Sequence, residues 1–428
     1  MSPAQFHSSS FQNSTMASTA IEPPELRNLA IPCQRAQVEH SADNSLPSRV
    51  ALLVASHTAQ SKAALVRETG LPRSTVSACV DTLVRRGLLT PTGTIAVDRG
   101  RPAERLVVNE KLGLLALADV GAHHTMLAVA DMNMRLLVCE RHIIDVSACS
   151  PEDFLDWLSE QLWRLAGRAR SDLPMRYAVL GLPARLDMHD GSPIRPPIMP
   201  GWDAFDTVGY LGETLGCPVM VENDTNLRAL GDAAIISASE QPLIEVKIGT
   251  GIGGGLIGSD GRIFHGFNGA AGEVGHTCFD PRIRRRCTCG QTGCIEAVAA
   301  VPAMLRRMQE LSPTAETPTT VEQLIERLRD GNLGAEQAVE EAGEAIGTMI
   351  ATLCNVLNPR HVIVSGMIVE ASDELLTVIR TTVYRRARPL TTRNLSIGRS
   401  PLGRFNGLAG ALVLATDRAL SAEHLFDR

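Results

Sequence analysis

The spacing of apolar residues predicts three short helices near the start of the chain. Between residues 48 and 58 valines and leucines recur on one helical face, and a second short apolar segment ends at Gly70, a residue type that commonly terminates helices. The third segment places four apolar residues on one face: Val76, Val80, Leu83 and Val84. The small turn from Gly70 to Pro72, between the second and third helices, is typical of a helix-turn-helix.

Two β-rich runs follow, at residues 94–97 and 105–108, and the Gly, Arg and Pro residues between them indicate the wing of a winged helix. The third helix is the expected DNA reader, because side chains at its N-terminal end can meet base edges and its free N–H groups can meet phosphates. The alternative is three solvated helices with ordinary surface arginines. The expected DNA contacts are Arg73, Ser74, Thr75 and Ser77 at the start of the helix, Arg85 and Arg86 at its end, and Arg99 and Arg101 in the wing.

From Leu112 onward β-rich and helical stretches alternate, which predicts an α/β fold. The first 47 residues are polar and show neither helical nor strand period, so we expect a disordered tail. The expected domains are therefore the tail at 1–47, a DNA-binding domain at 48–110 and an α/β domain at 111–420.

Charge is unevenly distributed along the chain. Residues 46–111 carry ten Lys or Arg against five Asp or Glu, a net +5, whereas the whole chain carries −6 and the remainder therefore −11. A basic segment on an acidic protein is the pattern of a nucleic-acid reader joined to a domain of another kind. No apolar run is long enough to cross a bilayer and no signal peptide is recognisable, so we expect a cytoplasmic protein without a membrane partner.

Cysteines cluster near the middle of the chain. Cys287 and Cys289 are too close in sequence for a relaxed disulfide with each other, and in a reducing compartment clustered cysteines more often bind metal. Three thiolates and one imidazole suit a closed tetrahedral Zn²⁺ site, with Cys278 as a fifth candidate. The expected metal ligands are His276, Cys287, Cys289 and Cys294.

Two further features suggest a binding site. Asp224 follows a short apolar strand, where ligands usually bind in open α/β sheets, so it is placed for a general base; alternatively it caps the next helix. The glycine-rich stretch at 249–255 permits close approach of a phosphate or sugar, although a hairpin turn has a similar sequence.

Taken together, the stretches VENDTN, GTGIGGGLI, AGEVGH and CTCGQTGCIE make residues 111–420 similar to the ROK family of sugar kinases and transcriptional repressors. The winged helix followed by GRPAERLVVN resembles the repressor branch. The resemblance implies a two-lobed actin-like (ribonuclease H-like) fold, with lobe 1 at about 111–225 plus the C-terminal helix, lobe 2 at about 226–400 and a cleft between them. If this chain is a kinase, the resemblance implies that Asp224 is its catalytic base. The sugar contacts that it implies are Asn223, Asp224, Glu273, His276 and Glu296.

The chain departs from the family's kinases where they hold ATP. Their phosphate-binding D-x-G-G-T turn reads DVGAHHT here, with Ala122, His123 and His124 crowding it, and Ile198 stands where they have an Asn. Ser365 replaces a glycine on the nucleotide side. The sugar site is thus retained while the phosphate-handling side is altered.

Two functions remain. The first is a DNA-binding transcriptional regulator, a repressor of carbohydrate uptake or metabolism genes, whose kinase-like domain binds a sugar, amino sugar or sugar phosphate without catalysis. We expect it to bind a palindromic operator as a homodimer or homotetramer. The second is an ATP-dependent sugar kinase acting on glucose or an N-acetylated hexosamine, alone or together with DNA binding. The intact Asp224 favours the second function, and the altered phosphate turn favours the first.

Overall fold

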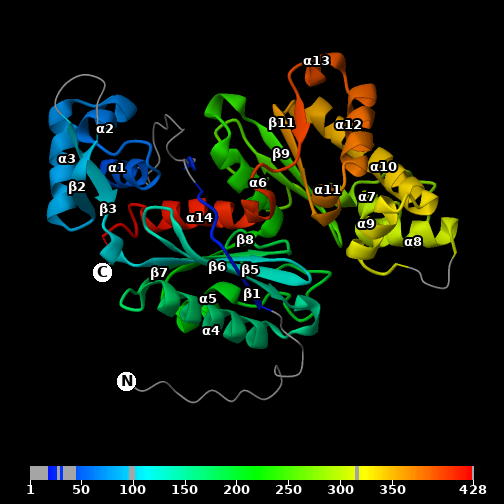
Figure 1. The fold of residues 1–428 in the computed structure, drawn as a ribbon, viewed down its shortest axis with the longest axis horizontal. Coiled ribbons are helices and arrows are strands. Elements are labelled where there is room, and N and C mark those ends of the chain that lie inside the picture. Colours follow the sequence, from blue (N-terminus) through cyan, green and yellow to red (C-terminus); the bar gives the residue numbers. More distant parts are fainter. Residues whose placement is uncertain (1–17, 27–28, 32–44, 96–101, 314–317, 427–428) are drawn as a thin grey trace.

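The computed structural model describes residues 18–26, 29–31, 45–95, 102–313 and 318–426. They form an N-terminal head and two α/β lobes, arranged as in Figure 1. None of the helices in these ranges combines the length and apolar character needed to cross a membrane.

The head contains the three predicted helices, α1 (Leu46–Ala55), α2 (Lys62–Thr69) and α3 (Arg73–Arg85). Side chains of Ser45 and Ser61 cap the first two, and Gly70, with a φ of 69°, ends α2 in the left-handed conformation that a turn into α3 requires. The strands β2 (Leu89–Ile95) and β3 (Ala103–Val108) pair antiparallel as the expected wing, whose tip lies outside the described residues.

The expectation of a disordered tail is wrong for part of the first 47 residues. Strand β1 (Ser18–Ile21) pairs antiparallel with β6 (Leu136–Ile143), and Leu29 and Ile31 are buried. The backbone N–H of Ala30 also donates to the carbonyl of Ala234 at 2.9 Å. Strand β1 has four residues and pairs with β6 through its backbone at the edge of the sheet. Its side chains therefore show no alternation of apolar and polar residues that could predict it.

Lobe 1 is built on a six-stranded sheet in the order β1-β6-β5-β4-β7-β8. Strands β4, β5 and β6 are antiparallel, and β4, β7 and β8 are parallel. Helices α4 and α5 cover one face, and α14 crosses the other (Figure 1). The elements are β4 (Leu114–Val120), β5 (His124–Asp131), β7 (Met175–Leu182), β8 (Val219–Asn223), α4 (Pro151–Arg170), α5 (Thr207–Leu215) and α14 (Asn406–Ala419).

Lobe 2 has a four-stranded sheet in the order β10-β9-β11-β12, and its helices enclose a separate apolar core. Its strands are β9 (Leu243–Ile248), β10 (Ile252–Ile257), β11 (His361–Ser365) and β12 (Ser396–Gly398). Its helices are α7 (Ile295–Ala299), α8 (Val301–Leu311), α9 (Val321–Arg329), α10 (Leu333–Leu357), α11 (Met367–Ala371), α12 (Glu374–Arg386) and α13 (Pro389–Thr392).

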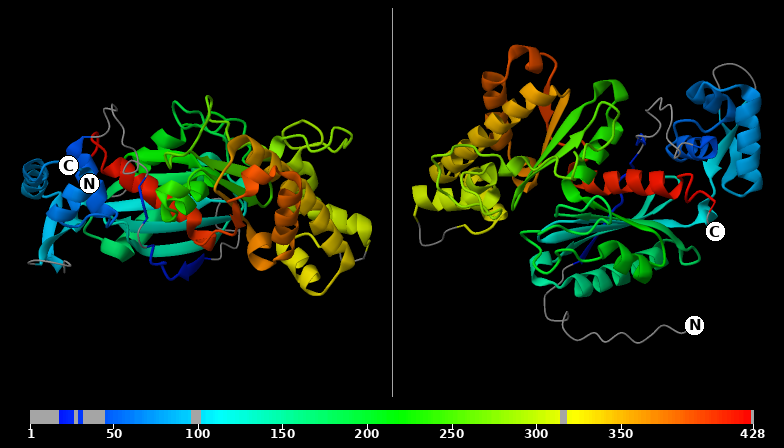
Figure 2. Two further views of the ribbon diagram at one scale, coloured as in Figure 1. Left: turned by 90° about the horizontal axis from the view of Figure 1, so that it is seen from above. Right: turned by 180° about the vertical axis from the view of Figure 1, so that it is seen from behind.

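Two helices join the three parts. Helix α6 (Asp224–Ile235) packs against α14 on one side and the β9–β10 hairpin on the other. The two helices approach so closely that a Cβ at Gly410 would lie 1.9 Å from the carbonyl oxygen of Leu227. Helix α1 of the head shares a core with α14, and the hydroxyl of Ser48 donates to the carbonyl of Leu420 at 2.6 Å. Figure 2 shows the head seated at the end of α14, away from lobe 2.

Candidate functional site

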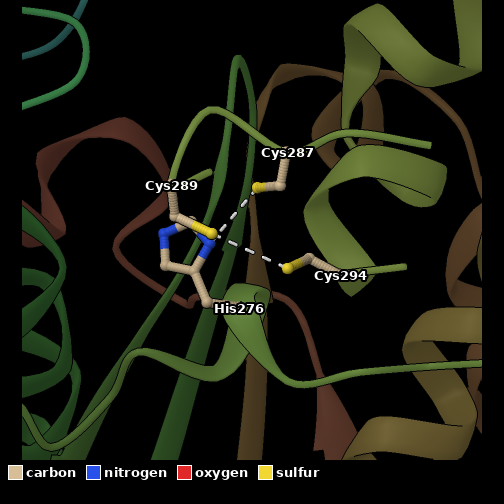
Figure 3. A group of neighbouring side chains, drawn as sticks. All are labelled: His276, Cys287, Cys289 and Cys294. Atoms are coloured by element: carbon tan, nitrogen blue, oxygen red, sulfur yellow. Dashed lines mark hydrogen bonds between the residues drawn. The ribbon is translucent and has the colours of Figure 1, made fainter. Parts of the chain in front are cut away.

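The four predicted metal ligands come together in lobe 2 (Figure 3). Their ligand atoms all lie within 4.8 Å of one another. The Sγ atoms of Cys289 and Cys294 are 3.8 Å apart, and Sγ of Cys287 is 3.5 Å from Nδ1 of His276. Ligands of a tetrahedral zinc ion lie about 3.8 Å apart for two sulfurs and about 3.5 Å apart for sulfur and nitrogen. The cluster therefore has the dimensions of a four-coordinate metal site.

The protonation chemistry of the thiols also favours a cation. Burial raises the pKa of Cys294 to about 12 and raises that of Cys287. Without a positive charge among them these sulfurs keep their protons, whereas a bound divalent cation displaces the protons and is held by thiolates. Cys278 is exposed and lies outside the group of four, although its backbone pairs with that of Cys294.

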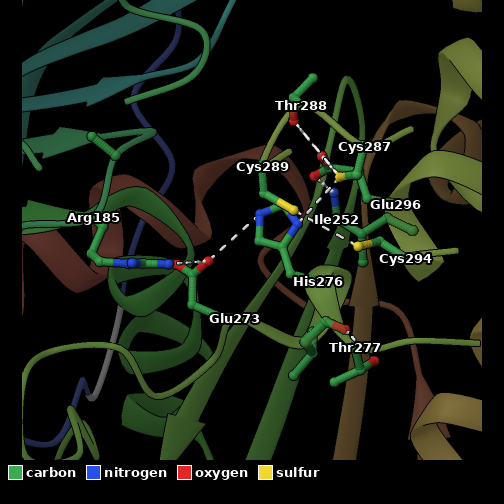
Figure 4. Close-up of polar contacts among 12 residues, drawn as sticks. Arg185, Ile252, Glu273, His276, Thr277, Cys287, Thr288, Cys289, Cys294 and Glu296 are labelled. Carbon is green, nitrogen blue, oxygen red and sulfur yellow. Dashed lines mark hydrogen bonds and ion pairs between the residues drawn. The ribbon is translucent and has the colours of Figure 1, made fainter. Parts of the chain in front are cut away.

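His276 connects this cluster to the expected sugar contacts. It ends the short 3₁₀ helix Val274–His276, and its Nε2 lies 3.6 Å from Oε2 of Glu273, on the side away from the thiols. Glu273 in turn pairs with Arg185 of lobe 1 at 2.8 Å (Figure 4). One imidazole thus faces the sulfur cluster through Nδ1 and the acidic group through Nε2.

Glu296 is the second carboxylate beside the cluster. It lies in α7, and its Oε2 accepts the backbone N–H of Ile252 at 3.1 Å, while its Oε1 accepts the hydroxyl of Thr288 at 3.0 Å. The contact with Ile252 joins α7 to the glycine-rich stretch. That stretch forms the β9–β10 turn and β10, so the hairpin alternative describes its backbone.

Asn223 and Asp224 stand at the junction of β8 and α6. Asn223 is the helix cap: its Oδ1 accepts the N–H groups of Thr225 and Asn226 at 3.0 and 3.2 Å. Asp224 does not serve as the cap, contrary to the alternative for this position. It is buried, and its Oδ2 accepts a hydrogen bond from Nζ of Lys247 on β9.

The site residues therefore fall into two groups. Glu273, His276 and Glu296 surround the thiol cluster, whereas Asn223 and Asp224 lie at the start of α6. The β9–β10 hairpin contacts both groups, through Ile252 and through Lys247.

Comparison with known proteins agrees with this arrangement. The family model described as "ROK family" matches residues 116–418, most of the chain. The chain belongs to the ROK family. A second model, the IclR helix-turn-helix domain, matches residues 52–93.

Curated relatives of this ROK protein include both regulators and enzymes. It is 28% identical to the xylose repressor of Bacillus spizizenii over 350 residues, covering 80% of this chain and 88% of the relative. It is 26% identical to the transcriptional repressor Mlc of Escherichia coli, and the match covers 74% of this chain and 80% of Mlc. The glucokinase of Halalkalibacterium halodurans is 29% identical over 61% of this chain and 82% of its own.

Solved structures agree with the fold. A ROK family transcriptional regulator described as a homologue of E. coli Mlc superposes with a TM-score of 0.72 at 24% identity, covering 88% of this chain and 96% of its own. The ROK hexokinase of Thermus thermophilus superposes with a TM-score of 0.57 at 28% identity, and the match covers 71% of this chain and 97% of the hexokinase. The first likeness covers a larger share of this chain than the second.

In this ROK protein an imidazole occupies the turn that holds ATP phosphates in the family's kinases. The ring of His124 lies against Gly121, where an added Cβ would be 2.9 Å from Cε1 of the ring. Burial lowers the pKa of His124 to about 3, so the ring is neutral. Asp119, which opens the turn, is buried, and its Oδ2 accepts a hydrogen bond from Arg228 at 2.7 Å.

Most of the predicted DNA contacts that the structure describes are exposed. Three of the four side chains at the start of α3 are exposed and Ser77 is half-buried. Arg85 and Arg86 are both exposed; Arg85 donates to the carbonyl of Asp81, and Arg86 lies over the ring of Phe426. Arg99 and Arg101 lie outside the described residues.

Reasoning from sequence missed the cations of the site. Arg185, Lys247 and His265 each pair with a carboxylate, and His265 does so with Glu222 at 2.8 Å. Charged residues within a mostly buried strand, such as Glu245 and Lys247 in LIEVKI, were the available signal.

Proposed function

We propose that this chain is a sugar-responsive transcriptional repressor whose head binds a palindromic operator and whose ROK domain binds the effector. The observation that carries the proposal is the double contact of His276, which faces the sulfur cluster on one side and Glu273 on the other. A sugar held at Glu273 and His276 would contact a residue fixed by the cluster. A displacement of His276 would reach the head through the β9–β10 hairpin, α6 and α14, each of which packs against the next.

Zn²⁺ is the proposed metal, held by His276, Cys287, Cys289 and Cys294. Its contribution is structural, because four protein ligands close the coordination shell and leave no position for a reactive water. Metal bound at Nδ1 fixes the tautomer of His276, so Nε2 carries a hydrogen and donates to Glu273 or to a sugar hydroxyl.

DNA binding is proposed to use the exposed start of α3, with Arg73, Ser74, Thr75 and Ser77 toward the major groove. Arg85, Arg99 and Arg101 are the proposed phosphate or minor-groove contacts. A twofold operator requires two heads, so we propose a homodimer or a homotetramer acting on DNA in the cytoplasm.

The test is operator selection followed by sugar titration. Genomic fragments captured by the purified, zinc-loaded chain should share an inverted repeat, and binding should weaken steeply with salt. The compounds to add are xylose, glucose, N-acetylglucosamine and the 6-phosphates of the two hexoses. At least one of them should change the affinity for the operator tenfold or more. D224N should keep operator binding and lose that response. Indifference of operator binding to all of these compounds would contradict the proposal.

The alternative, a sugar kinase, is favoured by the retained Asp224 and by the glucokinase and hexokinase relatives. Against it stand the ring of His124 at the phosphate turn and the ion pair that Asp224 makes with Lys247. Incubation of the chain with Mg-ATP and each sugar distinguishes the two: we expect no sugar phosphate, and product formation that D224N abolishes would establish the kinase.

A further inference from the structure

Lys247 places an ammonium group beside the carboxylate of Asp224, the position that the resemblance assigns to a sugar contact. The chain has only three lysines, Lys62, Lys111 and Lys247, among 41 basic residues. Lys247 stands near the end of β9, where its neighbours on both sides are buried and apolar. Its side chain is 21% exposed, and that of Asp224 is 5% exposed. An ammonium group partly removed from water in this way needs a function or a strong partner.

This ion pair and the neighbouring pair of Asp119 and Arg228 are each neutral in the absence of a ligand. Asp119 is balanced by Arg228, Asp224 is balanced by Lys247, and His124 is neutral. Removal of the lysine charge would leave these two ion pairs with a net negative charge, which repels an anion. With Lys247 present, an anionic ligand meets no net repulsion and gains an attraction to the ammonium group.

The two cations differ in what they can still bind. Arg228 is enclosed: it donates to Asp119 at 2.7 Å and to Asn406 at 2.9 Å, its side chain is 8% exposed, and its Nε is buried without a hydrogen-bond partner among the described residues. Lys247 has three N–H donors, and among the described residues Asp224 is the one hydrogen-bond partner found for it. Two of its donors therefore remain for a ligand. The same ion pair weakens Asp224 as an acceptor for a neutral hydroxyl.

We propose that Lys247 is a specificity-determining residue that makes the effector site select a phosphorylated sugar over the corresponding free sugar. The inference rests on the proposed function, namely that the ROK domain binds a sugar at Asp224. His124 fills the turn that would take the phosphates of ATP, so the phosphate that Lys247 meets is that of the sugar and not that of a nucleotide.

The experiment compares matched pairs of ligands by calorimetric titration of the full, zinc-loaded chain. The ligands are glucose and glucose 6-phosphate, N-acetylglucosamine and its 6-phosphate, xylose, inorganic phosphate and the ATP analogue AMP-PNP. In at least one pair the phosphorylated sugar should bind at least tenfold more tightly than the free sugar. K247M should remove that preference without weakening the free sugar, and K247R should retain it. K62M, which removes a lysine of the head, is the matched control and should behave as the wild type.

Each other outcome overturns the proposal. Equal or tighter binding of the free sugar, or a preference that survives in K247M, would show that Lys247 only neutralises Asp224. Tighter binding of AMP-PNP than of any sugar phosphate, lost in K247M, would assign the lysine to a nucleotide. Unchanged melting temperature and zinc content in K247M establish that the variant is folded. If a free sugar releases operator DNA, this inference fails while the proposed function stands; if no compound binds, both fail.

Discussion

The guanidinium of Arg86 lies over the aromatic ring of Phe426, with its central carbon 4.5 Å from the ring centroid. Arg86 follows the last residue of α3, and Phe426 belongs to the C-terminal segment beyond α14. The same segment is held to lobe 1, because Arg176 donates to the carbonyl of His424 and the rings of Tyr177 and His424 meet edge to face. The end of α3 is thus tied to the body of the protein.

Replacement of Phe426 by Ala should loosen the head from lobe 1. A cation–π contact of this exposure contributes about 0.5–1 kcal/mol, so amide exchange at residues 85–90 should accelerate roughly two- to fivefold. Hydrogen exchange followed by mass spectrometry measures this effect. F426L is the matched control, since it keeps apolar bulk and removes the ring; protection equal to wild type in F426L would mean that the ring face is unimportant.

Replacement of Arg73 by Ala should weaken specific operator binding by about 1–3 kcal/mol and leave sugar binding unchanged. The reason is that Arg73 is exposed at the first turn of α3, where a side chain can reach base edges. Fluorescence anisotropy with operator and scrambled DNA measures the ratio of specific to non-specific affinity. R329A, at an exposed position of α9 in lobe 2, should leave that ratio unchanged. An equal loss for both DNA sequences would make Arg73 a phosphate contact instead.

Local patterns were sufficient for the elements whose signal lies in their own residues. The buried face of α3, with Val76, Val80 and Leu83, followed from helical period, and the ligand group around Cys287 followed from residue type and spacing. The actin-like fold followed from the family resemblance and is confirmed by the comparisons. In these cases the sequence itself determines which side chains must meet.

Long-range partners could not be predicted in the same way. Strand β1 is placed by backbone pairing with β6, more than a hundred residues away, and the contact of Arg86 with Phe426 joins residues from opposite ends of the chain. Crowding of the DVGAHHT turn was expected from its residues, but that the ring of His124 is the one that lies against Gly121 depends on how the turn folds. The pairing of Lys247 with Asp224 likewise depends on how β9 packs beside α6.

Replacement of Cys289 by Ser should abolish stoichiometric zinc binding and destabilise lobe 2. A structural metal contributes folding free energy directly, and a lost thiolate leaves two buried thiols whose pKa values burial raises. Metal analysis and thermal unfolding should show the loss of zinc and a lower melting temperature. C278S removes an exposed thiol of the same segment and should retain both. Zinc loss in C278S as well would place a fifth ligand in the site.

Replacement of Arg228 by Ala should lower the free energy of unfolding by about 3–5 kcal/mol, because it leaves Asp119 buried without its partner. Asn406 would lose a hydrogen bond in the same change. R307A removes an exposed arginine that pairs with Glu341 at a similar distance, 2.7 Å, and should cost at most about 1 kcal/mol. Urea unfolding of both variants measures the difference; equal costs would show that burial of the Asp119 pair is energetically unimportant.

The contact between His265 and Glu222 should make stability depend on pH. The hydrogen bond that His265 donates to the carboxylate of Glu222 raises the pKa of His265 above its ordinary 6.5, outweighing the burial that lowers it. Because the pKa is higher in the folded than in the unfolded state, the stabilisation is fully present below 6.5 and is lost as pH rises through the folded value. The difference in unfolding free energy between wild type and H265Q should therefore shrink from about pH 6 to about pH 8. H189Q, which changes an exposed histidine, serves as the control in urea unfolding at each pH. A difference that is constant, or that grows with pH, would show that the charged form of His265 is not the one that the fold favours.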